Sequence, residues 1–423
     1  MNSPSSVALC FALLLPGVSS AAAPVQEPEA SSSLRVVSRR LAPDMPGCYN
    51  ALYLQQTGAC LRSSDRVSTN NGRTWISEPM PPDYITGLPE GYRREPCTSV
   101  VDPFTGCLLT IVKALDTPGL DPKAHEPRVA LETYYLRYRV SADGGKSWLF
   151  DEPIVQAGSF TAQHPFEGVW IGKNCIFLGD LGCVPLVTRA GKILVPAQTT
   201  PLGSDGKLWN PSGGHTYTDV LALIGTWTNG QHLTWRTSQR VTGDPRRTTR
   251  GVIEPTLAEF PDGRILMVMR GSNGGKADPQ CELPSCKWFS ISQDGGETWS
   301  RPEPWTFADG KPLLSPSSMS ALFRHSSGRY FWAGNLSTTN CRANLPRWPL
   351  AMAEVDARSL KPIHSSVLTV DTQRPEDKTR GRLDLSHLTL LEDRENKQII
   401  LTYPRSYNAY KSNEWATVRL AVK

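Results

Sequence analysis

Residues Ser292–Trp299 read SQDGGETW, and the same octapeptide pattern, Ser-x-Asp/Asn-x-Gly-x-Thr/Ser-Trp, occurs as STNNGRTW at Ser68–Trp75 and SADGGKSW at Ser141–Trp148. This pattern is an Asp-box. Its Asp or Asn accepts hydrogen bonds from its own turn, its Gly takes a positive φ, and its Trp packs beneath the loop. The copies are separated by about one and two units of a common period, which indicates a repeated supersecondary module. The sequence therefore predicts a β-propeller.

A second repeat predicts the number of blades. Six segments place a polar turn with Gly or Asn directly before an apolar strand, at a spacing that suits one four-stranded blade plus loops. The turns are Thr57-Gly58-Ala59, Thr105-Gly106-Cys107, Ala190-Gly191-Lys192, Asp262-Gly263-Arg264, Ser327-Gly328-Arg329 and Asn396-Lys397-Gln398. We therefore predict an all-β fold, a six-bladed β-propeller over residues 42–423. The hairpin Trp227–Trp235 is the best candidate for a degenerate Asp-box.

The N-terminus has the features of an export signal. Val7–Val18 is apolar but too short to span a bilayer, and small residues follow it. We expect a signal peptide at residues 1–23, a flexible Pro-, Glu- and Ser-rich leader at 24–41, and an exported protein, periplasmic or extracellular. No membrane span is expected.

The charge and the cysteine content limit the classes of partner and metal site that we expect. The formal charge of +5 is spread along the chain without a basic tract, so nucleic acid is not an expected partner. Nine cysteines remain after the signal, and the pairs Cys97 with Cys107 and Cys281 with Cys286 are close enough to close local loops. No Cys/His cluster has zinc spacing, so we expect no metal. We also expect no cofactor and a monomer.

The blade geometry indicates where a site would lie. Glu254 and Arg270 are symmetric about the turn at Asp262, so we expect them to be cross-strand neighbours at the axial mouth of the propeller. One polar residue per blade follows each turn at a similar distance. These residues are Asp65, Lys113, Gln198, Arg270, Asn335 and Tyr403. Such a ring of charged, amide and phenol groups on a rigid scaffold predicts a glycan-binding mouth.

The Asp-boxes together with Glu254–Arg270 (EPTLAEFPDGRILMVMR) resemble the sialidase (neuraminidase) superfamily, from about Ala42 to the C-terminus. The resemblance implies an exo-hydrolase that removes a terminal acidic sugar. It implies that Glu254 is the base for a tyrosine nucleophile and that Arg270 binds the substrate carboxylate. Arg347 and Tyr403 are the best matches for the arginine of the fifth blade and the tyrosine of the sixth, with Arg342 and Tyr407 as competitors.

The chemistry implied by the resemblance is consistent. A tyrosine nucleophile avoids the repulsion between an anionic nucleophile and the substrate carboxylate, but a phenol needs a bonded base at neutral pH. Asp65 is expected to act as the acid. Lys113, Asn335 and Gln198 are expected to contact the substrate.

One position departs from the family pattern and keeps two alternatives open. Asn50 stands where sialidases place the first arginine of their triad. Another acidic sugar, such as a uronic acid, is therefore an alternative substrate, and a histidine paired with a tyrosine would suit a polysaccharide lyase acting by β-elimination. A carbohydrate-binding propeller without catalysis is the second alternative.

Overall fold

The structure is a computed structural model that describes residues 32–63, 65–78, 88, 91–117, 129–229 and 232–423. The predicted signal peptide and the first part of the predicted leader lie outside the described residues.

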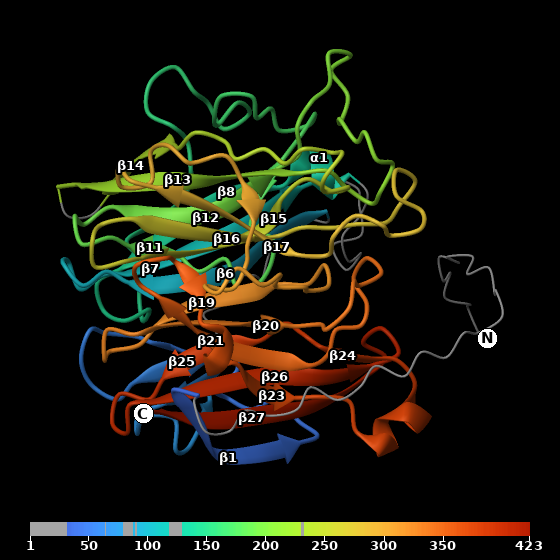
Figure 1. Cartoon of the computed structure of the whole chain (residues 1–423). Coiled ribbons are helices and arrows are strands. Elements are labelled where there is room, and N and C mark those ends of the chain that lie inside the picture. Colours follow the sequence, from blue (N-terminus) through green and yellow to red (C-terminus); the bar gives the residue numbers. More distant parts are fainter. Residues whose placement is uncertain (1–31, 64, 79–87, 89–90, 118–128, 230–231) are drawn as a thin grey trace, which may run out of the picture.

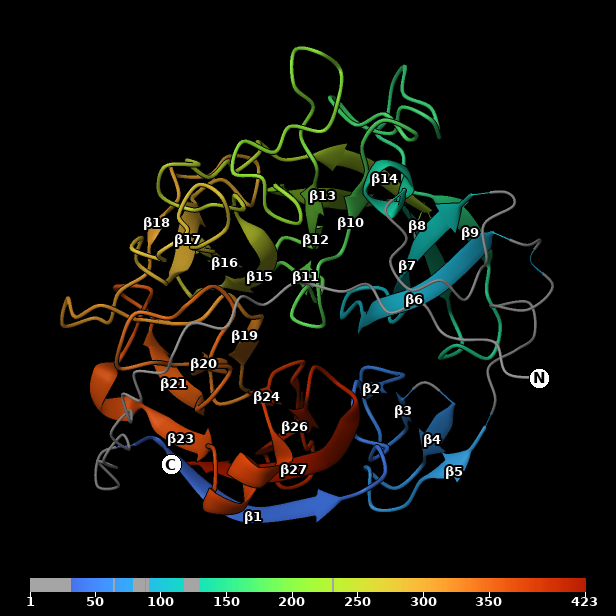
Figure 2. The same ribbon diagram turned by 90° about the vertical axis from the view of Figure 1, so that its right-hand side faces the viewer.

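Six small antiparallel sheets are arranged in a ring, which confirms the six-bladed β-propeller (Figures 1 and 2). The first sheet contains β2 (Leu52–Tyr53), β3 (Leu61–Ser63), β4 (Arg66–Ser68) and β5 (Ile76–Ser77). The second contains β6 (Tyr92–Val101), β7 (Leu108–Asp116), β8 (Tyr135–Ser141) and β9 (Phe150–Pro153), with α1 (Ala130–Thr133) before β8. The third contains β10 (Ile176–Phe177), β11 (Leu186–Val187), β12 (Ile193–Thr199), β13 (Asp219–Thr228) and β14 (His232–Thr237).

The remaining three sheets complete the ring. The fourth contains β15 (Ile253–Glu259), β16 (Ile265–Arg270), β17 (Lys287–Ser292) and β18 (Glu303–Pro304). The fifth contains β19 (Ser320–Arg324), β20 (Tyr330–Asn335), β21 (Leu350–Asp356), β22 (Lys361–Pro362) and β23 (Leu368–Asp371). The sixth contains β24 (Leu383–Leu385), β25 (Thr389–Glu392), β26 (Gln398–Tyr407), β27 (Ser412–Val422) and β1 (Leu34–Ala42). All six predicted turns join strands at the expected places in these sheets.

The flexible leader predicted for residues 24–41 is wrong in its last part. Leu34–Ala42 forms β1, which pairs antiparallel with β27 from Leu34↔Val422 to Ala42↔Trp415. The strand near the N-terminus is thus the outermost strand of the sixth sheet and lies beside the C-terminal strand (Figure 2). This pairing ties the two ends of the described chain together, so a propeller built only from residue 42 onward would leave β27 as an exposed edge.

The three Asp-boxes form the predicted turns. In the third, the hydroxyl of Ser292 donates to Asp294 at 2.8 Å, and Asp294 accepts the backbone N–H of Thr298 at 3.0 Å. Gly296 has φ 92°, and a Cβ at this position would lie 2.7 Å from Leu194. The indole of Trp299 is buried and donates to Ser238 at 3.1 Å. Each box joins the third and fourth strands of its blade.

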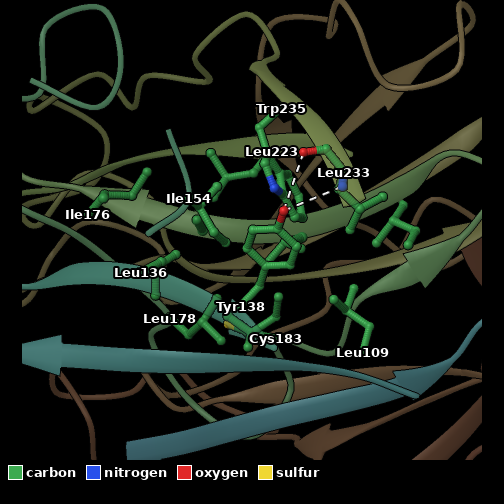
Figure 3. Close-up of a cluster of buried hydrophobic side chains, with 14 of the residues drawn as sticks. Leu109, Leu136, Tyr138, Ile154, Ile176, Leu178, Cys183, Leu223, Leu233 and Trp235 are labelled. Carbon is green, nitrogen blue, oxygen red and sulfur yellow. Dashed lines mark hydrogen bonds between the residues drawn. The ribbon is translucent and has the colours of Figure 1, made fainter. Parts of the chain in front are cut away.

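The core is built where neighbouring blades pack face to face. Figure 3 shows the cluster between the second and third blades, in which Tyr138 of β8 packs against Trp235 of β14. The hydroxyl of Tyr138 accepts the N–H of Leu233 at 3.4 Å, so its polar end is satisfied inside the cluster. Each such buried apolar side chain contributes about 2 kcal/mol by leaving water.

The cysteines and the helices give two further results. The nine cysteines between Cys48 and Cys341 are all free, so neither local pair considered from the sequence forms a disulfide. Within the described ranges, no helix has the length and apolar character needed to cross a membrane.

Candidate active site

Glu254 and Arg270 form an ion pair at one end of the fourth blade. Arg270, the last residue of β16, pairs with Ile253 of β15, and a register shift between Ile253 and Thr256 gives Glu254 a φ of 51°. This irregularity directs the carboxylate of Glu254 onto Nη1 of Arg270, while Nε of Arg270 donates to Ser317 at 2.8 Å. The predicted cross-strand neighbourhood is therefore confirmed.

Gln198 holds Glu254 in this conformation. Its side-chain oxygen Oε1 accepts the backbone N–H of Glu254 at 2.9 Å, and Gln198 itself is buried. Gly179 lies directly against both residues: a Cβ there would lie 2.3 Å from Oε1 of Gln198 and 2.6 Å from Cγ of Glu254. The structure thus places Gln198 behind Glu254 as a support, where only a glycine leaves room for both side chains.

Asn335 supports the segment that carries Arg347. Its side-chain nitrogen donates to the carbonyls of Arg347 at 3.0 Å and Leu385 at 2.9 Å, which joins the fifth blade to the sixth. Arg347 is buried, and its Nη1 donates to the hydroxyl of Tyr410 at 2.5 Å.

Tyr410, His387 and Asp180 form a hydrogen-bonded chain. The Tyr410 hydroxyl lies 2.9 Å from Nε2 of His387, and Nδ1 of His387 lies 3.0 Å from Oδ2 of Asp180. Asp180 belongs to the third blade and His387 to the sixth, which lie opposite each other in a six-bladed ring. Since opposite blades meet only at the centre, this contact places the chain on the propeller axis.

We call Asp180, Glu254, Arg270, Arg347, His387 and Tyr410 the axial cluster. Its members differ in exposure: Tyr410 is 42% exposed and the His387 side chain 33%, whereas the Arg270 side chain is 11% exposed. The tyrosine and the histidine therefore face solvent, above a layer of charged groups that is largely buried.

Charge and burial shift the pKa of His387 in opposite directions. Burial lowers the pKa of His387, but the hydrogen bond and the negative charge of Asp180 outweigh burial, and the pKa is raised overall. Burial raises the pKa of Asp180, but His387 outweighs it and the net shift is downward. Burial also raises the pKa of Tyr410, although the charge of Arg347 opposes this rise. The phenol therefore stays protonated unless a neighbouring base takes its proton.

Lys287 adds a buried basic side chain next to the axial cluster, since it pairs with Arg270 across β16 and β17. Its ammonium donates to the carbonyls of Pro316 and Ser318. Complete burial lowers the pKa of Lys287 to about 7, and the positive charges of Arg270 and Arg347 act in the same direction. Two guanidinium groups, Arg270 and Arg347, and one carboxylate, Glu254, are thus near enough to act on Lys287, and this excess of positive charge favours an anionic ligand.

Tyr403 and Tyr407 do not belong to this cluster. Tyr403 is fully buried, and its hydroxyl donates to Asp371 at 2.8 Å, so the expected contact with Glu254 is not formed. Tyr407 is also buried, and its hydroxyl donates to Asp377 at 2.7 Å. Both carboxylates also bind the guanidinium of Arg405, so the two phenols are part of a buried structural network that joins β23 of the fifth blade to β26 of the sixth.

Asp65 and Lys113 also take no part in the hydrogen-bonded chain of Tyr410, His387 and Asp180. Asp65 is exposed in the turn between β3 and β4, where its backbone carbonyl accepts the N–H of Glu78 at 2.7 Å. Lys113 forms an ion pair with Glu95 at 2.9 Å and lies over the ring of Tyr134.

The position of the missing arginine is occupied by a turn. Asn50 has φ 54°, and its backbone N–H donates to Thr389 at 3.1 Å. Its neighbour Tyr49 reaches the axial cluster instead, because its hydroxyl donates to the carbonyl of His387 at 3.0 Å. The competing Arg342 is exposed.

Sequence reasoning missed Tyr410, His387 and Asp180. Tyr410 follows Asn408 and Ala409 in a turn whose three residues have φ values of 51°, 56° and 69°, and no periodic pattern marks such a turn. The one signal in the sequence was the place of this turn within its blade. It joins β26 to β27, just as the loop after Arg270 joins β16 to β17 in the fourth blade.

A large cavity lies elsewhere in the described part of the chain. It has a volume of about 890 Å³ and is lined by residues of β1, β23 and the segment around Lys311, on the outer side of the fifth and sixth blades. Its lining shares no residue with the axial cluster.

Comparison with known proteins places the chain in a family. Residues 124–364, more than half of the chain, match the BNR repeat-like domain. The chain belongs to the BNR repeat-like family. None of the curated proteins compared with this BNR repeat-like protein matched it in sequence.

Solved structures share the fold of this BNR repeat-like protein at low identity. A protein of unknown function from Dyadobacter fermentans is 14% identical with a TM-score of 0.56, and the alignment covers 92% of this chain and all of that one. Trypanosoma rangeli sialidase is 15% identical with a TM-score of 0.51, over 85% of this chain and 49% of the sialidase. The chain therefore spans about half the length of that sialidase. These similarities show that this chain shares its propeller fold with those two proteins.

Proposed function

We propose that this protein is a glycan-active enzyme that cleaves a glycosidic bond at an acidic sugar. The observation that carries the proposal is the solvent-facing Tyr410 hydroxyl, which is held between the guanidinium of Arg347 and the imidazole of His387. A phenol placed between a cation and a base is ready for proton transfer or attack, because the base accepts its proton and the cation stabilises the oxyanion.

Two guanidinium groups supply the recognition of the acidic sugar. Arg270 and Arg347 present planar guanidinium groups that match a carboxylate, and their positive charge keeps the pKa of the neighbouring Lys287 low. The sugar carboxylate binds on the solvent side of the two arginines. This arrangement brings the adjoining ring carbons to the Tyr410 hydroxyl.

The proposal keeps the substrate class expected from the family resemblance but reassigns the reactive tyrosine. Tyr403 is enclosed in the sixth blade, whereas Tyr410 faces solvent beside a base. Glu254 serves as the partner of Arg270 rather than as the base for the tyrosine.

The test is turnover of a panel of α-sialosides, uronides and neutral glycosides by the mature protein and by Tyr410→Phe. We expect cleavage confined to acidic substrates and a loss of about 10²-fold or more in Tyr410→Phe. Tyr330→Phe is the matched control. It removes a hydroxyl that donates to the carbonyl of Glu259, which lies at the end of β15 away from Glu254. Binding of acidic sugars without any turnover would instead assign a carbohydrate-binding propeller.

Export is part of the proposal and is supported by the apolar stretch Val7–Val18 followed by small residues. Expression of the full chain with fractionation of cells and medium tests it. A protein found outside the cell with a shortened N-terminus is expected, and retention of the intact chain in the cytoplasm would contradict export.

A further inference from the structure

The hydrogen-bonded chain in the axial cluster has a defined direction. An Asp180 carboxylate only accepts hydrogen bonds, so Nδ1 of His387 carries a hydrogen and Nε2 of the neutral ring is an acceptor. A guanidinium only donates, so Arg347 donates to the Tyr410 oxygen. The Tyr410 proton is therefore directed at His387.

The same contacts prepare both partners for proton transfer. Asp180 stabilises the imidazolium that forms when His387 takes the proton, and Arg347 stabilises the Tyr410 oxygen that loses it. The two exposed groups lie 2.9 Å apart, so they meet a substrate from the same side.

Each carboxylate of the axial cluster already has a basic partner, Arg270 for Glu254 and His387 for Asp180. Hydrolysis by a tyrosine nucleophile needs a separate acid to protonate the leaving oxygen. Glu254 is paired with Arg270, Asp180 holds His387, and Asp65 lies exposed in a tight turn. β-Elimination has a different requirement: a base and an acid side by side, together with cations that stabilise the carboxylate of the substrate as its neighbouring carbon loses a proton.

We propose that the axial cluster catalyses β-elimination at a 4-linked uronic acid, with Tyr410 and His387 as the catalytic residues. This inference rests on the proposed function and names its substrate class and reaction. Arg270 and Arg347 bind the uronate carboxylate, and Asp180 is a positioning residue that sets the tautomer of His387.

The reaction balances without a co-reactant. The Tyr410 proton moves to Nε2 of His387, and the Tyr410 oxygen takes the proton from C5 of the uronate. The electron pair of the C5–H bond forms the C4–C5 double bond, and the C4–O4 bond breaks with its pair on O4. The proton on His387 then passes to O4, which restores the neutral imidazole and the phenol.

The experiment offers the mature protein polygalacturonate, alginate and hyaluronan in water enriched in heavy oxygen. Elimination is expected to give products whose new double bond absorbs in the ultraviolet and whose mass shows no oxygen from water. Both Tyr410→Phe and His387→Gln are expected to lower the rate by about 10²-fold or more. His232→Gln is the matched control, because this exposed histidine also lies beside a carboxylate, Glu152 at 3.3 Å, but on the outer strand of its blade.

The outcomes separate the inference from the function on which it rests. A saturated product that carries heavy oxygen, formed from any acidic substrate and lost in Tyr410→Phe, would overturn elimination and leave the proposed function in place. Absence of cleavage for every sialoside and uronate tested would overturn both. Thermal unfolding curves that match the wild type are the control that a variant with a lower rate is still folded.

Discussion

The hydroxyl of Tyr410 lies 2.9 Å from Nε2 of His387 at the centre of the propeller. The second ring nitrogen of His387 is held by Asp180 from the opposite blade. This relationship connects a turn in the last blade with a loop in the third, and it joins the reactive hydroxyl to a base whose orientation is set by a carboxylate.

The first prediction concerns the pH dependence of the rate. His387 accepts a proton only when neutral, so the rate should rise with pH through its raised pKa. Asp180→Asn removes the charge that raises this pKa, so the acidic limb of the kcat/KM profile should move to lower pH while the maximum rate falls. Asp309→Asn is the control. It alters another carboxylate–histidine pair, in which Oδ2 of Asp309 lies 3.0 Å from Nδ1 of His364. An unmoved acidic limb in Asp180→Asn would show that His387 is not the base.

Tyr403→Phe should weaken the fold and spare the reaction. The variant loses the hydroxyl that donates to Asp371 at 2.8 Å, and a buried hydrogen bond to a charged group contributes about 1–3 kcal/mol. Denaturant unfolding should show this loss, while kcat measured well below the unfolding transition should stay within about twofold of the wild type. A rate lost in Tyr403→Phe with unchanged stability would restore Tyr403 as the reactive tyrosine.

Gly179→Ala should displace Glu254 without changing any charge. The added Cβ would lie 2.6 Å from Cγ of Glu254 and 2.3 Å from Oε1 of Gln198, so one of them must move. A shift of about 1 Å in a catalytic site lowers the rate by about 10²-fold. Gly214→Ala, whose Cβ would meet its nearest atom at 3.5 Å, is the control. Equal kcat/KM values for the two variants would contradict the role of Gly179 in positioning Glu254.

Lys287 should make stability depend on pH. Between about pH 7, to which burial lowers its pKa, and the ordinary lysine value of 10.5, the unfolded chain binds a proton that the native side chain has released. The unfolded state binds more protons in this window, so the free energy of unfolding rises with pH. Lys287→Met should remove this rise between about pH 7 and about pH 9, whereas Lys207→Met on an exposed loop should keep it. Identical pH slopes in the wild type and Lys287→Met would contradict the buried, neutral lysine.

Local chemistry explains what the sequence predicted correctly about the fold. Each Asp-box is stabilised by bonds within eight residues, such as the Thr298 N–H donated to Asp294, so its pattern is visible in the chain. The symmetry of Glu254 and Arg270 about one turn is equally local, and their side chains meet as expected. The error at Leu34–Ala42 has the opposite origin, because this strand pairs with residues near position 420 and such a distant pairing leaves no local signature.

The sequence by itself determined the blades, their number and the pairing of Glu254 with Arg270, because hairpins and Asp-boxes are made by residues close together in the chain. Only the tertiary structure decided which tyrosine faces the axis. Tyr403 lies within β26 and its hydroxyl is bound by Asp371 of the neighbouring blade, whereas the turn that follows β26 brings Tyr410 to His387. A contact between opposite blades depends on closure of the whole ring, and no short stretch of sequence records that geometry.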